Sequence, residues 1–300
     1  MKHLFLVNPA AGKTDRSDEA AAAAKALCDS LGELWELKRS EGPGHITELA
    51  RQAGQTGEET KVYACGGDGT LNEAAEGALG YENLSLTHVP LGSGNDFIKQ
   101  FSDPKRFFAM SNFAETEEKA IDLIQAGPRI SVNICSMGFD ARIGTAIDAF
   151  RRNPLLSGER AYHASVVVNL LKGVSKPCRV ELEDGTVLEK DMTLVCVCNG
   201  SWYGGSYHPV PEANITDGLL EVLVVKHVSR LTVAKVIGAY QKGRYADFPE
   251  LISHYQVRSL RIVTPEEEPV NLDGELMLSR DLSLRVLPHA LRFFAPKGAW

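Results

Sequence analysis

The chain has 300 residues, of which 44% are hydrophobic and 24% are charged, and its formal net charge is −7 at pH 7. This length is ample for two domains. The acidic balance disfavours a general nucleic-acid binder and adhesion to anionic membranes through bulk charge. The apolar runs are far shorter than the roughly 18 residues of a membrane-spanning helix, and the first residues do not resemble a signal peptide. We therefore expect a cytoplasmic protein without a nucleic-acid partner.

The six cysteines form no C-x-x-C pair, and most have apolar or β-branched neighbours. This pattern favours free, buried thiols in a reducing compartment over a zinc site or disulfides. The residues concerned are Cys28, Cys65, Cys135, Cys178, Cys196 and Cys198.

The first half of the chain alternates between apolar runs typical of strands and segments typical of helices. Such alternation predicts an α/β domain with a parallel sheet covered by helices. The expected strands are Leu4–Val7, Leu34–Leu37, Val62–Cys65 and Leu84–Val89, and the expected helices are Ser17–Leu31, His45–Ala53, Thr70–Leu79 and one that starts near Asn95.

The second half is richer in predicted strands, for which antiparallel pairing is expected. We place the boundary near Ala126-Gly127-Pro128, which gives domains 1–126 and 127–300, with a tail of about residues 290–300 that packs back onto the first domain. The expected strands are Ile130–Cys135, Cys178–Leu182, Thr193–Cys198, Leu219–Val225, Val257–Val263 and Leu282–Val286, and the expected helices lie near Ala141–Arg151, Tyr162–Lys172 and Leu231–Tyr240.

Two glycine-rich loops each follow a predicted strand and precede a helix: Gly66–Thr70 and Leu91–Asp96. Glycines let backbone N–H groups converge on an anion, and the helix N-terminus behind them adds positive potential. Each loop alone is also compatible with a tight turn that binds nothing. Since the carboxyl ends of parallel strands share one edge of a sheet, both loops, with Asn8–Lys13 after the first strand, are expected to border one ligand crevice.

Two other nucleotide motifs are excluded. A P-loop that ends at Gly12-Lys13 requires glycine at position 7, which is Val7. The dinucleotide motif G-x-G-x-x-G is also absent, because Leu71 occupies the place of the last glycine.

Together these loops resemble the diacylglycerol kinase catalytic family, which includes bacterial lipid kinases and sphingosine and ceramide kinases. The resemblance covers nearly the whole chain in order. It rests on Asn8-Pro9, Gly66–Thr70 with Asn72-Glu73, Gly92–Asp96, Ser136-x-Gly138-Phe139-Asp140, Asp217-Gly218 and Asp273-Gly274-Glu275. The family implies an α/β nucleotide domain, a β-rich lipid domain and an active site in the cleft between them.

The resemblance implies that ATP is the phosphoryl donor. The family's nucleotide contacts fall on Asn8, Pro9, Ser40, Gly66, Gly67, Asp68, Gly69, Thr70, Leu71, Asn72, Ser93, Gly94 and Asn95. Family members often have threonine at the Ser93 position, and serine keeps the hydroxyl. They commonly have an arginine shortly after the Asn-Asp pair, where this chain has Lys99, and the two cations are not equivalent at a phosphate.

The segment Asp273-Gly274-Glu275 resembles the family's catalytic segment. A kinase needs a base or acceptor that orients the substrate hydroxyl. Asp273 is the first candidate and Glu275 the second. In a strand both would face one side, whereas a turn at Gly274 would separate them. Without the resemblance, a hairpin turn followed by a surface acid would explain the segment equally well.

The loop from Asn214 to Leu219 resembles the family's Mg²⁺ loop. The resemblance assigns the carboxylate of Asp217 and the backbone carbonyls of Asn214 and Leu219 to the ion, and these are ligand types that Mg²⁺ accepts. The family often has two acids here, where this chain has Thr216 before Asp217. Asp68 and Asp96 are expected to join a network of metal-bound water.

The resemblance therefore predicts an Mg²⁺- and ATP-dependent kinase for a lipid hydroxyl, with diacylglycerol or a related lipid as acceptor. Contact with the membrane surface would be peripheral and transient, and a homodimer is compatible with the family. Two alternatives stay open. One is a small-molecule kinase similar to NAD kinases, and the other is a nucleotide- or lipid-binding relative without catalysis.

Overall fold

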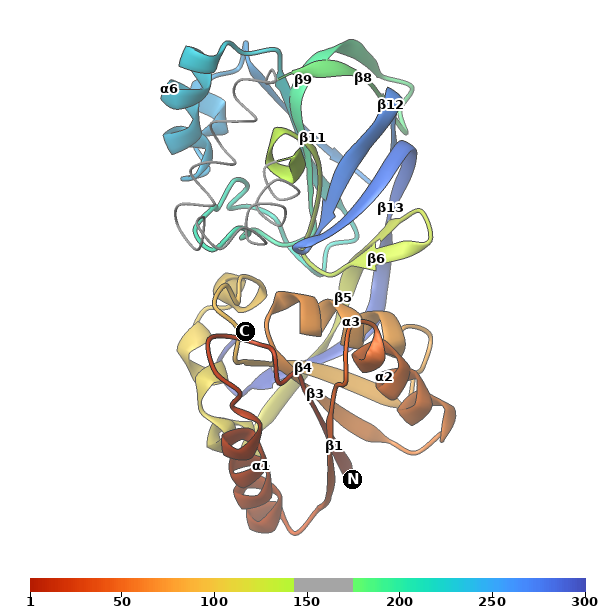
Figure 1. The fold of residues 1–300 in the computed structure, drawn as a ribbon, viewed down its shortest axis with the longest axis vertical. Coiled ribbons are helices and arrows are strands. Elements are labelled where there is room, and N and C mark those ends of the chain that lie inside the picture. The colour runs from red at the N-terminus through yellow and green to blue at the C-terminus, as the bar shows by residue number, and fades with distance from the viewer. Residues whose placement is uncertain (143–174) are drawn as a thin grey trace.

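The computed structural model describes residues 1–142 and 175–300, which form two lobes stacked along the long axis (Figure 1). The helices expected near Ala141–Arg151 and Tyr162–Lys172 lie almost entirely outside the described residues. The lower lobe begins with β1 (Lys2–Val7), α1 (Ser17–Leu31), β2 (Leu34–Arg39), α2 (His45–Gln55), β3 (Thr60–Gly66), α3 (Asp68–Ala78) and β4 (Leu84–Pro90).

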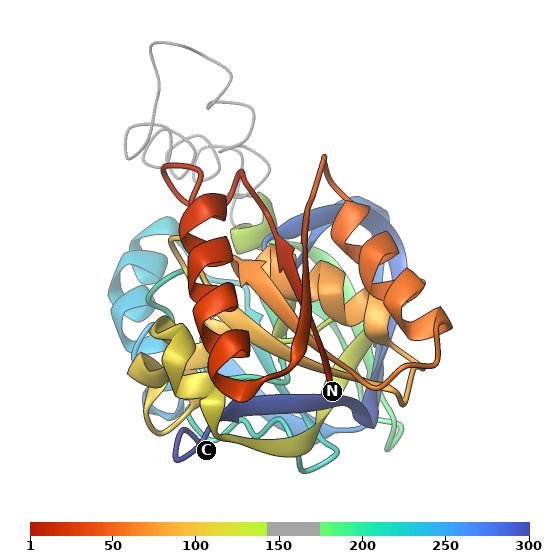
Figure 2. The ribbon, with the colours of Figure 1, turned by 90° about the horizontal axis from the view of Figure 1, so that it is seen from below.

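The first four strands of the lower lobe pair in parallel: β1 with β2 and β3, and β3 with β4. Residues of β1, β3 and β4 are buried along nearly their whole length. Burial on both faces explains why these strands are continuous apolar runs in the sequence. Helix α1 ends at Gly32, whose φ of 68° is the left-handed conformation that glycine adopts without strain. Figure 2 shows α1 and α2 on opposite sides of these strands.

The prediction of a helix that starts near Asn95 is wrong in helix type and in length. The chain instead forms three short 3₁₀ helices, η1 (Phe97–Gln100), η2 (Pro104–Phe108) and η3 (Met110–Ala114). Pro104 suits the start of η2, because its fixed φ fits a helix and the N–H that it lacks has no helical partner at that position. The loop before η1 is thereby held by short turns that pack against the lower lobe.

Two long antiparallel strands, β5 (Thr116–Ala126) and β13 (Glu275–Pro296), run through both lobes. Ile121 on β5 belongs to the core of the lower lobe, whereas Ile124 belongs to the core of the upper lobe. Near its end, β13 joins the parallel strands, where Phe293 pairs with Leu86 of β4. The two lobes therefore share a continuous sheet instead of a flexible linker.

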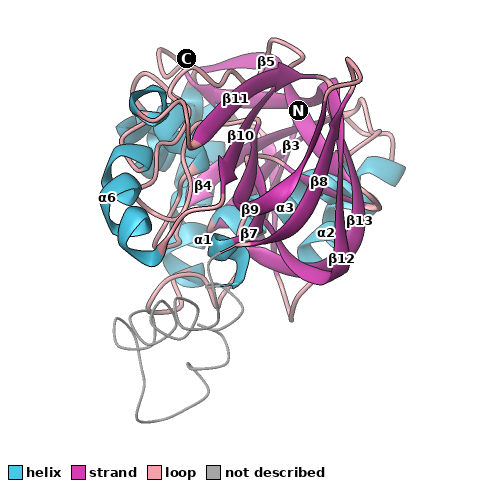
Figure 3. Cartoon of the chain, turned by 90° about the horizontal axis from the view of Figure 1, so that it is seen from above, coloured by secondary structure: helices cyan, strands magenta, loops and turns pink. Residues whose placement is uncertain are grey.

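The upper lobe is built from antiparallel strands. Within the described part of the chain, both lobes share one 13-stranded sheet, of which ten strands follow the order β11-β10-β9-β7-β12-β13-β4-β3-β1-β2. The other three lie off this path: β5 pairs with β13 and β6, and β8 pairs with β12 and β9. Figure 3 shows α6 on one side of the upper-lobe strands. The remaining elements are β6 (Arg129–Ser131), β7 (Ile134–Gly138), β8 (Lys176–Leu182), β9 (Val187–Cys198), β10 (Leu220–Lys226), α6 (Arg230–Tyr240), η4 (Tyr245–Asp247), β11 (Ile252–Val257) and β12 (Ser259–Leu272).

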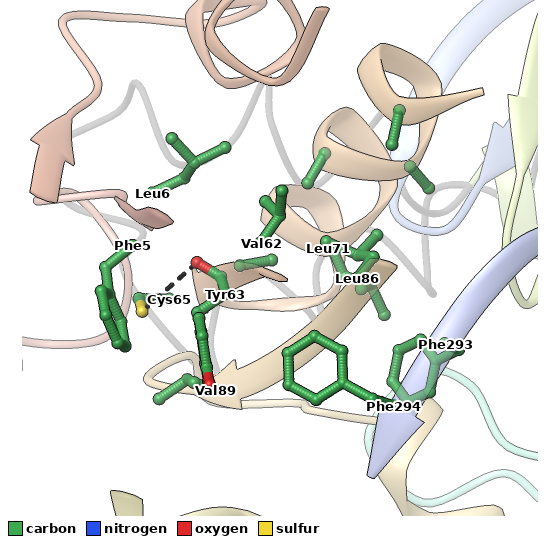
Figure 4. Packing of buried hydrophobic residues seen from close by; sticks show 14 of the residues in the cluster. Phe5, Leu6, Val62, Tyr63, Cys65, Leu71, Leu86, Val89, Phe293 and Phe294 are labelled. Atoms are coloured by element: carbon green, nitrogen blue, oxygen red, sulfur yellow. Dashed lines mark hydrogen bonds between the residues drawn. The ribbon is translucent and has the colours of Figure 1, made fainter. Parts of the chain in front are cut away.

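The core of the lower lobe is rich in aromatic rings (Figure 4). Phe5 stacks on Tyr63 with ring centroids 4.2 Å apart, and Phe293 packs against Phe97 at 5.2 Å. Both chain termini lie in this lobe (Figures 1 and 2). All six cysteines are free and buried. Among the described helices, none is both long and apolar enough to cross a membrane.

We predict that Phe293→Ala destabilises the protein by about 3–5 kcal/mol, because it removes a fully buried aromatic ring and leaves a cavity. Phe108→Ala is the matched control, since Phe108 is 62% exposed, and it should change stability by less than about 0.5 kcal/mol. Denaturant unfolding curves measure both values. Equal midpoints for the two variants would contradict the placement of the C-terminal strand in the lower-lobe core.

Candidate active site

The two glycine loops predicted from the sequence lie against each other. The carbonyl of Gly66, at the end of β3, accepts hydrogen bonds from Leu91 N at 2.8 Å and Gly92 N at 3.1 Å. A Cβ on Gly92 would lie 2.5 Å from the Cα of Gly67, so a larger residue would push the loops apart. His88, buried on β4, hydrogen-bonds the same carbonyl through Nε2 at 3.0 Å. Burial lowers the pKa of His88, which favours its neutral form.

The loop after β1 reaches both glycine loops. Asn8 donates from Nδ2 to Thr70 Oγ1 at 3.1 Å. A Cβ on Gly12, whose φ is 83°, would lie 2.6 Å from the carbonyl oxygen of Leu91. The carboxyl ends of β1, β3 and β4 thus bring Asn8, Gly66–Thr70 and Gly92–Asp96 together.

Two carboxylates flank this loop cluster. A Cβ on Gly94 would lie 3.1 Å from Asp68 Oδ2 and 3.6 Å from Asp96 Oδ2, so both acids approach the same glycine. Asp68 Oδ1 accepts a hydrogen bond from Phe97 N at 3.0 Å, which ties the first loop to η1. Asp96 Oδ1 lies 2.5 Å from the ammonium of Lys99. Lys99 is therefore engaged by a carboxylate in this structure.

Leu71 and Asn72 have structural positions in helix α3. Leu71 is a core side chain, and its N–H bonds Gly67 O within the helix. Asn72 is fully buried, donates from Nδ2 to Ile130 O at 3.2 Å and accepts from Val132 N at 3.2 Å. These contacts account for both residues without a ligand, and their predicted contact with a nucleotide stays a prediction.

The other predicted nucleotide residues line the loops. Ser93 is exposed, and Ser40, directly after β2, donates its N–H to Val7 O at 2.8 Å. Pro9 is half-buried beside Asn8. Asn95, with a φ of 49°, donates from Nδ2 to Gly92 O at 2.8 Å, and its buried Oδ1 has no partner among the described residues.

Asp273 is held by the segment Ser131–Ile134. Its carboxylate accepts hydrogen bonds from Val132 N at 2.6 Å, Ile134 N at 2.7 Å, Ser131 Oγ at 2.8 Å and Asn133 N at 3.1 Å. Burial raises the pKa of Asp273 to about 6, and these hydrogen bonds oppose the rise because they stabilise the charged form. Near neutral pH the carboxyl is thus mostly ionised but close enough to titration to accept a proton.

Glu275 lies apart from Asp273. Asp273 and Gly274 form the turn between β12 and β13, so the two acids do not share a strand face. Glu275 Oε2 instead accepts from Arg129 Nη2 at 2.7 Å, and Arg129 Nε reaches Glu76 of α3 at 3.1 Å. The hydrogen bond that Arg129 donates to Glu275 and the nearby acids raise the pKa of Arg129 further, so the cation that links α3 to the segment after Asp273 stays charged.

The predicted metal loop is anchored by a buried acid that the sequence interpretation missed. Asp122 of β5 is fully buried and accepts from Gly218 N and His289 N, both at 2.7 Å. Asp217 Oδ1 accepts from Leu219 N at 3.0 Å in a tight turn. Burial raises the pKa of Asp217, and repulsion from Asp122 adds to the rise. A bound cation would relieve this repulsion.

The oxygen atoms of the Asn214–Leu219 loop suit a weakly held Mg²⁺. Within the described ranges, no hydrogen bond occupies the backbone carbonyls of Asn214 and Leu219, so both remain available with the second oxygen of Asp217. Mg²⁺ accepts such oxygen ligands and keeps several waters. The described residues contain no cluster of three or more His, Cys, Asp or Glu side chains, and no hydrogen bond or ion pair among them joins this loop to Asp68 or Asp96. The predicted water network between the two places stays a prediction.

Some site residues could have been found from the sequence. Asp122 is a lone charge in the apolar run Ala120–Ile124, and such a charge usually indicates a buried partner. Arg129 and Ser131–Ile134 carry no comparable signal, because their role depends on which segment the turn at Asp273 meets after folding.

The arrangement combines glycine-rich loops at the carboxyl edge of a parallel sheet with a hydrogen-bonded, partly buried carboxylate on an antiparallel β-rich lobe. Two family models match consecutive parts of the chain and meet at residues 133–134. The diacylglycerol kinase catalytic domain matches residues 2–134, and the YegS C-terminal NAD kinase beta sandwich-like domain matches residues 133–295. The chain belongs to the diacylglycerol kinase family of the YegS type, and it is a kinase.

Similar proteins agree with this assignment. A protein of Chromohalobacter salexigens named "Probable lipid kinase YegS-like" is 29% identical over 260 residues, which cover 85% of this chain and 82% of that protein. A protein of Pseudomonas aeruginosa with the same name is 29% identical over 302 residues, which cover 96% and 93%. The crystal structure of a diacylglycerol kinase from Bacillus anthracis has a TM-score of 0.72 at 20% identity and covers 100% of this chain and 98% of that one, which supports the fold.

We predict that Ser131→Ala raises the pKa of Asp273 above its value of about 6 by roughly one unit, because a hydrogen bond to the charged form is lost. A titration of carboxyl carbon-13 shifts with labelled aspartate measures this pKa. Ser102→Ala is the control, since Ser102 donates to Ala299 O and does not contact Asp273. An unchanged or lower pKa in Ser131→Ala would show that the hydroxyl does not stabilise the carboxylate.

Proposed function

We propose that the chain transfers the γ-phosphate of ATP to a lipid hydroxyl, with diacylglycerol or a related lipid as acceptor. The observation that carries the proposal is the shared N–H of Val132. This one group donates to Asp273 and also to Asn72 of α3, the helix that begins at the first glycine loop. The candidate base is thereby held at a fixed position relative to the proposed phosphate site.

The glycine loops supply phosphate binding in this proposal. Gly66–Thr70 leads into the N-terminus of α3, where backbone N–H groups and the helix dipole favour an anion. Gly67 and Gly92 pack closely against each other and carry no side chains, so a phosphate can approach the backbone N–H groups there. Phosphoryl transfer needs mainly such positioning, with charge neutralisation of the transferred group.

Asp273 accepts the proton of the acceptor hydroxyl in this proposal. Its oxygens are already occupied by backbone N–H groups and by the hydroxyl of Ser131. Of these donors, only the Ser131 hydroxyl can rotate away from Asp273 Oδ2. The acceptor hydroxyl could then donate its hydrogen bond to that oxygen. Below about pH 6 the carboxyl is protonated and cannot act as a base, so the rate is expected to fall as the pH is lowered through this value.

Mg²⁺ would be held by the Asp217 loop, and Asp68 and Asp96 near the glycine loops would join it through metal-bound water. When bound, the ion supplies positive charge to phosphate oxygens. The lipid acceptor is suggested by the names of the relatives and by an exposed apolar side chain, Leu278, which lies three residues beyond Glu275 on β13 and is 61% exposed. Contact with a membrane surface would then be peripheral.

Transfer of label from γ-labelled ATP in the presence of Mg²⁺ tests the function. The acceptors are diacylglycerol, monoacylglycerol, sphingosine, ceramide, phosphatidylglycerol, undecaprenol and NAD. We expect label in one lipid with the wild-type chain and none with Asp273→Asn or Gly67→Asp. Gly238→Asp adds the same charge in open space on α6 and should retain activity. Label in NAD alone would move the chain to small-molecule kinases, and ATP binding without any transfer would oppose catalysis.

The metal loop is tested by Asp217→Asn. We expect the Mg²⁺ concentration for half-maximal activity to rise by at least about 10-fold. Loss of a residue that only supports a metal ligand already weakens metal binding by roughly that factor. The stabilisation of the chain by Mg²⁺ in thermal unfolding without ATP should fall in parallel. Asp184→Asn is the control, because Asp184 Oδ1 accepts from Thr186 N in an equivalent turn. The same Mg²⁺ response in both variants would contradict a metal role for Asp217.

A further inference from the structure

A hairpin of the upper lobe docks on the second glycine loop. The chain between β9 and β10 lies at the underside of the upper lobe, facing the lower lobe (Figure 1). There Tyr203 and Tyr207 exchange both backbone hydrogen bonds at 2.9 Å, which defines the Tyr203–Tyr207 hairpin. Gly205 at its tip has a φ of 82°, a conformation that favours glycine.

Both backbone polar groups of Gly205 bind the lower lobe. Its N–H donates to Asp96 Oδ2 at 2.8 Å, and its carbonyl accepts from Lys99 Nζ at 2.7 Å. Lys99 and Asp96 are paired with each other at 2.5 Å, so the three groups form a closed ring of charge-assisted hydrogen bonds. We call this contact of Asp96, Lys99 and Gly205 the Gly205 latch.

The hairpin is also connected to the candidate base. Asn133 donates from its side chain to the carbonyl of Trp202, and the backbone N–H of the same Asn133 donates to Asp273. The Trp202 ring stacks on His208 with centroids 4.1 Å apart, and Lys99 Nζ lies 5.9 Å from the Trp202 centroid. A continuous path of contacts thus leads from Asp273 through Trp202 to Lys99 and the second glycine loop.

We propose that Lys99 is a positioning residue that closes the upper lobe onto the second glycine loop, and that the Tyr203–Tyr207 hairpin borders the acceptor site. This deepens the proposed function and rests on it. Lys99 is 27% exposed and its ammonium is used by Asp96 and Gly205, so its charge serves the contact between the lobes instead of a phosphate. The hairpin reaches the candidate base through Asn133, which places it beside the group that receives the acceptor proton.

The decisive comparison uses Lys99→Met, Lys99→Arg and the control Lys105→Met, whose lysine is exposed on η2. For Lys99→Met we expect faster amide hydrogen exchange across residues 202–208 and a loss of about 10-fold in kcat/KM for the acceptor, within the range of coupling through contiguous side chains. The KM for ATP should stay within about twofold, because positioning leaves the phosphate contacts intact. Lys99→Arg should restore both values, since a guanidinium can donate to Asp96 and to a carbonyl, and Lys105→Met should match the wild type.

A raised KM for ATP with unchanged exchange in Lys99→Met would make Lys99 a phosphate ligand and overturn the proposal. Unchanged exchange together with unchanged kinetics would equally overturn it. The exchange measurement needs no substrate. If the wild-type chain phosphorylates none of the acceptors, the proposed function fails, whereas an increase in exchange confined to Lys99→Met still supports the latch.

Discussion

The structure depends on the hydrogen bonding of one partly buried carboxylate, that of Asp273. Removing a carboxylate from water is unfavourable unless hydrogen bonds replace the lost solvent. Here the N–H groups of Val132, Asn133 and Ile134 replace it, and they do so from the short segment that enters β7. Because Val132 N also binds Asn72, the same hydrogen bonds that compensate the desolvated charge fix the turn at Asp273 against α3. The position of the candidate base and the packing of the segment before β7 thus rest on the same contacts.

A fully buried acid, Asp122, holds the chain together at the junction between the lobes. Asp122 lies in the middle of β5, at the point where the strand passes from one core to the other, and it binds backbone N–H groups of two segments that are distant in sequence. One of them, His289, has a φ of 51°, an uncommon conformation for a residue other than glycine. The hydrogen bond to Asp122 compensates that conformation where β13 bends into the lower lobe. The sheet can therefore cross the junction without a hinge loop.

Local sequence patterns were sufficient for the loops and for most elements, and insufficient for the contacts between them. The apolar runs of β1, β3 and β4 indicate strands, because burial on both faces requires apolar residues. The glycines after these strands indicate tight turns, because a left-handed or closely packed backbone favours glycine. Strand β5 was missed because Thr116–Ala120 is polar and exposed and shows no alternation. The hydrogen bonds of Glu275 with Arg129 and of Asn72 with Val132 join residues that are 146 and 60 positions apart in the chain. No local sequence pattern predicts such tertiary contacts.

The contacts across the lobes differ in how easily they can exchange with water, and this difference bears on movement. Asn72 is fully buried, so its bonds to Ile130 and Val132 would be costly to break without replacement. Arg129 is 35% exposed and Lys99 is 27% exposed, and water can replace their bonds at much lower cost. Any movement between the lobes should consequently begin at these two charged contacts, the pair of Arg129 with Glu275 and the Gly205 latch, while the bonds of Asn72 persist.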